Sequence, residues 1–118
     1  MEENPNSELF KKYLILAAEY RNEEAMFLLA MHYKNGSNGF EKDNIKAFAW
    51  FLESGYCLVS NGFLEVGKYL VFGSDCGLIP KNHKAAEAYL NKVEGKENEI
   101  EKNKLLQIIE MDKNKKQK

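Results

Sequence analysis

The chain has 118 residues, of which 44% are apolar, and 17 Lys and Arg residues nearly balance 18 Asp and Glu residues. This composition fits a single domain over residues 1–118 and excludes global disorder. The net charge of −1 excludes the strongly basic surface of a dedicated DNA-binding protein. Two cysteines exclude a disulfide-stapled scaffold, and the acidic start of the chain is unlike a signal peptide. With no apolar run near the roughly 20 residues of a membrane span, we expect a cytoplasmic protein.

Apolar residues recur at three- and four-residue steps, which predicts helices separated by a few Gly and Pro turns. The first helix is expected over residues 7–20, where it would bury Leu9, Phe10, Tyr13, Leu14, Leu16 and Ala17. A second helix should begin at Asn22 and end before Gly36, because Asn caps helix starts and Gly favours the left-handed conformation that ends them.

The remaining helices are expected in the same way. The third is capped by Asp43 or Asn44, the fourth covers residues 60–72, and the fifth runs from the cap Asn82 to Val93. A sixth helix over residues 97–112 precedes a frayed, lysine-rich tail at 113–118. No segment shows the alternation of a strand, so the predicted fold class is all-α.

Two parts of the chain match each other. Leu29-Ala30 aligns with Val66-Gly67 and Gly36 with Gly73, all 37 positions apart. Beyond the loop, Lys46-Ala47 aligns with Lys84-Ala85 at a spacing of 38. The match predicts two helix pairs, over residues 22–58 and 59–95.

This pattern resembles the Sel-one-like repeats, which are relatives of the tetratricopeptide repeats. The residues that carry the resemblance are Ala25, Leu29, Tyr33, Gly36, Ala47, Trp50 and Phe51 in the first copy and Gly67, Gly73, Ala85 and Tyr89 in the second. The resemblance implies a short α-solenoid of two helix hairpins between N- and C-terminal capping helices. It also implies protein binding on the concave surface, with small residues where helices approach and Trp50 between the two repeats.

One face of the first helix in each repeat is not used for packing within or between the repeats. It carries Phe27, Met31, Lys34, Leu64, Lys68 and Val71, which would form an apolar, lysine-flanked strip for a partner protein. The alternative is that the first or the C-terminal helix of the chain covers these residues.

The leading hypothesis is a non-enzymatic protein-binding module: an inhibitor or immunity-type protein that neutralises a toxin or effector, or an adaptor. We expect no cofactor, no metal site and a monomer, and interpret His32 and His83 as packing or surface residues. A competing hypothesis is a hydrolase or thiol enzyme that uses Cys76, Asp75 and His83. Weak nucleic-acid binding through the tail is a third, and it would use Lys113, Lys115, Lys116 and Lys118.

Overall fold

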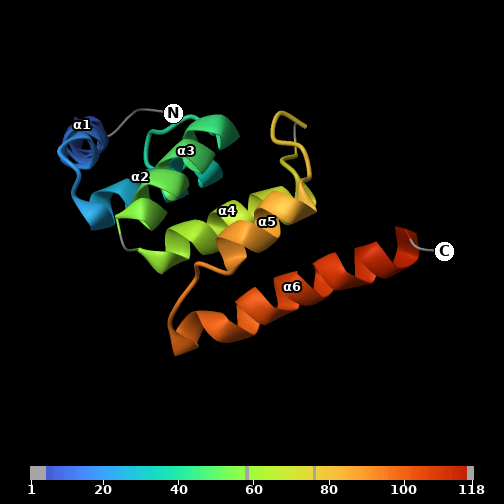
Figure 1. Ribbon diagram of the computed structural model, residues 1–118. Helices are drawn as coiled ribbons and strands as arrows, with labels where there is room; N and C mark the ends of the chain where they lie inside the picture. The colour runs from blue at the N-terminus through green and yellow to red at the C-terminus, as the bar shows by residue number, and fades with distance from the viewer. Residues whose placement is uncertain (1–4, 58, 76, 117–118) are drawn as a thin grey trace. The chain divides into compact units, whose positions relative to one another are not determined.

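The computed structural model describes residues 5–57, 59–75 and 77–116, which form six helices and no strand (Figure 1). The all-α prediction is therefore confirmed. Contacts divide the chain into two compact units, Met1–Val59 and Ser60–Lys118. The first unit contains α1 (Pro5–Glu19), α2 (Glu23–Asn35) and α3 (Asn44–Tyr56), and the second contains α4 (Ser60–Phe72), α5 (His83–Leu90) and α6 (Lys96–Lys116).

Local capping chemistry sets the first residue of three helices and the last residue of α2. The Asn22 side chain accepts a hydrogen bond from the Ala25 backbone N–H at 2.9 Å, which starts α2. Gly36 ends α2 in the left-handed conformation, with φ at 66°. Asp43 and Asn82 cap α3 and α5 through the same kind of side-chain bond. The predicted caps of α2, α3 and α5 are confirmed.

A backbone hydrogen bond closes each hairpin. The Asp43 N–H donates to the carbonyl of Tyr33 in the last turn of α2 at 2.8 Å. The Asn82 N–H donates to the carbonyl of Leu70 near the end of α4 at 2.7 Å. The same bond thus joins α3 to α2 and α5 to α4, and each connected pair packs as a helix hairpin.

The two hairpins correspond closely, but with a different register from the predicted one. Helices α2 and α4 both have 13 residues and begin 37 positions apart, whereas the caps Asp43 and Asn82 are 39 apart. The second loop is therefore two residues longer, and Ala47 corresponds to Ala86, both fully buried. The expected equivalence of Ala47 with Ala85 is wrong by one residue, because the cap, rather than the Lys-Ala pair, fixes where the helix begins.

The corrected register explains the packing of the second helix in each hairpin. Phe51 and Leu90 become equivalent, and both are fully buried. Trp50 becomes equivalent to Tyr89, and both are half-buried. Trp50 packs against the core of the first unit, which is formed by Leu14, Ala18, Ala25, Met26, Leu29 and Phe40.

Helix α1 buries a different face from the expected one. Leu14 and Ala18 enter the core, whereas Leu9, Phe10, Tyr13 and Leu16 are exposed. The reason is that α1 packs mainly on α2 and, through Lys11, on the loop that follows α2, so one side of the helix is covered within this unit. Four of the six side chains expected in the core therefore lie at the surface.

The ends of α5 and α6 also differ from expectation. Helix α5 stops at Leu90 rather than Val93, because the N–H groups of Lys92 and Val93 bond three residues back in a tighter turn. Helix α6 continues to Lys116, well into the segment predicted to fray. There Lys113 pairs with Glu87 of α5 at 3.1 Å.

Gly67 allows α4 and α5 to approach closely. A Cβ atom at this position would lie 2.5 Å from Cδ2 of Leu90, well inside van der Waals contact. The small residue expected at this helix contact is thus required by the buried Leu90 side chain opposite it.

Gly67→Ala should lower the free energy of unfolding, because overpacking costs about 1–3 kcal/mol while the gain in helix propensity is at most about 1 kcal/mol. In a Leu90→Ala background the same substitution should instead stabilise the protein, since the clash is gone. Urea denaturation of the four proteins in this cycle measures both effects. The same sign in both backgrounds would contradict the close approach.

Candidate protein-binding surface

The strip predicted on α2 and α4 is largely covered. Leu64 and Val71 are only 5% and 2% exposed, so the expectation that they face outward is wrong. Helix α6 packs on α4 (Figure 1), and Lys68 bridges the two helices through ion pairs with Glu65 and Glu101. Within the second unit, the alternative that the C-terminal helix covers this face is the correct one.

In the first unit, the three predicted strip residues are half-buried. The Phe27 ring lies edge-on to Phe51 of α3, with the centroids 5.4 Å apart. Met31 and Lys34 are partly covered as well. Phe27 is therefore a packing residue of the α2–α3 hairpin rather than a free anchor for a partner.

The larger exposed apolar surface lies on α1, where sequence reasoning expected core. Leu9, Tyr13, Leu16 and Tyr20 are 50%, 62%, 45% and 80% exposed. Their steps of four, three and four residues place them in one line along the helix. Tyr20 keeps the helical position because its N–H donates to the Leu16 carbonyl at 3.0 Å. We call these four residues the outer α1 stripe.

The opposite side of α1 is anchored to the rest of the first unit. At about 100° per residue, Leu14 and Ala18 point away from the stripe, and both are buried. The Phe10 ring lies edge-on to His32, and the Lys11 ammonium donates to the Gly39 carbonyl at 3.3 Å. The stripe therefore belongs to a helix that is already held by its other face.

Two charges lie along one flank of the stripe. Lys12 and Glu19 are exposed and seven residues apart, on the side of α1 away from Phe10 and Ala17. Among the residues that the structure describes, neither has an ion-pair partner. The apolar stripe is thus bordered by one positive and one negative group.

His32 is a packed histidine, as expected. Its ring stacks on Phe40, and Nδ1 lies 2.7 Å from the Ser37 hydroxyl and 3.5 Å from Nδ2 of Asn38. Burial lowers the pKa of His32, which favours the neutral ring.

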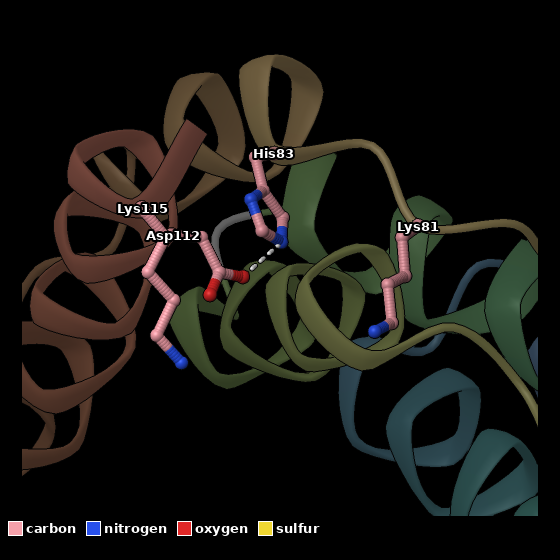
Figure 2. Close-up of a pocket in the computed structure, with 4 residues that line it drawn as sticks. All are labelled: Lys81, His83, Asp112 and Lys115. Carbon is pink, nitrogen blue, oxygen red and sulfur yellow. Dashed lines mark ion pairs between the residues drawn. The ribbon is translucent and has the colours of Figure 1, made fainter. Parts of the chain in front are cut away.

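A polar hollow of 360 Å³ lies in the second unit, lined by Lys81, His83, Asp112 and Lys115 (Figure 2). His83 Nε2 donates to the Val71 carbonyl at 3.2 Å and lies 3.5 Å from Oδ2 of Asp112. This contact ties the start of α5 to the end of α6. The two residues are 29 positions apart, so no local sequence signal could have paired them.

The residues proposed for a hydrolase or thiol enzyme are Cys76, Asp75 and His83. Cys76 lies outside the described residues. His83 contacts Val71 and Asp112, and Asp75 is exposed on the loop. In the described part of the chain, no three His, Cys, Asp or Glu side chains are grouped as metal ligands would be.

Comparison of the chain with known protein families and with characterised proteins finds no match. None of the described helices has the length and apolar character needed to cross a membrane. The surface of α1 is therefore interpreted from its own geometry.

The two faces of α1 should respond differently to a charge. Leu14→Asp should lose about 3 kcal/mol or more of stability, because it places an unpaired carboxylate in the core. Leu16→Asp should change stability by no more than about 0.5 kcal/mol, as at other exposed sites. Chemical denaturation at low protein concentration compares the two, and equal losses would show that the stripe is core.

Proposed function

We propose that this chain is a non-enzymatic protein-binding module of the Sel-one-like repeat type, and that it binds through the outer α1 stripe. The observation that carries the proposal is the exposure of Leu9, Tyr13, Leu16 and Tyr20 in one line on an anchored helix. Contiguous exposed apolar side chains bordered by charges are typical of interaction surfaces.

The spacing of the stripe suits a helical partner. Apolar residues that alternate at steps of three and four form the seam along which two helices pack. In the first unit the outer side of α1 carries such a line of apolar residues, and it is exposed because α1 contacts α2 and Gly39 with its other side.

The narrower role that we propose is that of an inhibitor, immunity-type protein or adaptor. A module that covers an apolar helix of its partner blocks or recruits that partner by binding alone. Inhibitors, immunity-type proteins and adaptors act in this way. The tyrosines favour this use, because aromatic side chains supply much of the binding energy at protein interfaces.

Site-specific photo-crosslinking in cells that express the chain tests the proposal. A benzophenone amino acid replaces Tyr13 in one variant and Tyr56 of α3 in the matched control, since the two tyrosines are 62% and 59% exposed. We expect one protein to be captured from position 13 and not from position 56. Adding Leu16→Asp should abolish that adduct.

Two results would contradict the proposal. The first is the same set of adducts from both positions, which would indicate random collision. The second is an adduct at position 13 that survives Leu16→Asp, because contact would then not depend on the stripe.

A further inference from the structure

We propose that the occupant of the outer α1 stripe is the stripe of a second copy of this chain, with the two α1 helices antiparallel. The inference rests on the proposed function, because it assumes that the stripe is a protein interface. The order of apolar side chains and of charges along α1 identifies a second copy as the partner.

The order of apolar side chains favours antiparallel pairing. Along the stripe, Leu9 and Leu16 alternate with Tyr13 and Tyr20. In an antiparallel pair centred on the stripe, Leu9 faces Tyr20 of the second copy and Tyr13 faces Leu16. Every layer then contains one leucine and one tyrosine, so the layers have the same volume. A parallel pair would instead stack leucine on leucine and tyrosine on tyrosine, with uneven layers.

The flanking charges favour the same orientation. In an antiparallel pair, equivalent flanks of the two helices face each other, so Lys12 of one copy lies beside Glu19 of the other. In this pair, position 10 of one helix lies directly opposite Glu19 of the other. Lys12 is two residues from position 10, which is about 3 Å along the helix axis. Symmetry makes the contact twice. In a parallel pair this flank would face Phe10 and Ala17, which carry no charge.

The pairing should be weak and dependent on concentration. The seam spans two heptads of a single helix, which is much smaller than a standard interface of about 1,600 Å². The dilute protein is then a monomer, as expected from the sequence, and the pair forms as the concentration rises. A weak self-contact of this kind can be displaced by another helix with a similar face.

Sedimentation equilibrium over a wide concentration range provides the test. The weight-average mass of the full chain should rise from 13.6 kDa toward twice that value. Lys12→Glu and Glu19→Lys should each remain monomeric, because each variant places like charges opposite one another. An equimolar mixture of the two should associate again, since both contacts then join opposite charges. Lys104→Glu on α6 makes the same charge change at another exposed site and should associate like the unmodified chain.

Three outcomes would overturn the inference: a monomer at every concentration, single variants that associate like the unmodified chain, or a mixture that stays monomeric. Each leaves the proposed function separately testable. Capture of a different protein from position 13, together with a monomer at every concentration, would support the stripe as an interface while excluding the second copy as its occupant.

Discussion

The bond between the N–H of a helix cap and a carbonyl near the end of the preceding helix shapes both units. It forms between Asp43 and Tyr33 and again between Asn82 and Leu70. The loop can return to the helix it has just left because Gly36 and Gly73 have positive φ values. Once the cap is placed, the direction of the second helix and its buried residues follow.

This hairpin construction explains which apolar side chains are buried and which remain exposed. Phe51 and Leu90 fill the contact between paired helices, and in the second unit α6 adds a further layer on α4 and α5. The first unit has α1 in addition to its hairpin, and α1 packs mainly on α2 and on the loop that follows it. Leu14 and Ala18 are the side chains of α1 that are buried in the core, whereas the outer α1 stripe is exposed.

Local chemistry made most of the fold predictable from the sequence. Asn22, Asp43, Asn82 and Gly36 act through their own turns, so their roles could be inferred without tertiary information. The register of the second repeat was misassigned because it was taken from the Lys-Ala pair, whereas the caps Asp43 and Asn82 are 39 positions apart and make Ala86 the equivalent of Ala47.

The candidate site was harder to predict for a related reason. Helix α1 carries apolar residues around most of its circumference, so periodicity alone does not reveal which side faces the core. The sequence left open whether Leu64 and Val71 are free or covered, because nothing in it indicates that α6 packs on α4. Such contacts depend on residues far apart in the chain, as with His83 and Asp112.

The central claim is that the outer side of α1 meets the same side of a second copy, and an isotope-filtered NOE experiment tests it most directly. In a concentrated mixture of labelled and unlabelled chains, the account predicts a contact between the Leu9 methyl groups and the Tyr20 ring. These residues are about 16 Å apart along one helix, so the signal must come from two molecules. Contacts from Leu9 to Leu9, or from Leu9 to residues outside α1, would contradict the account.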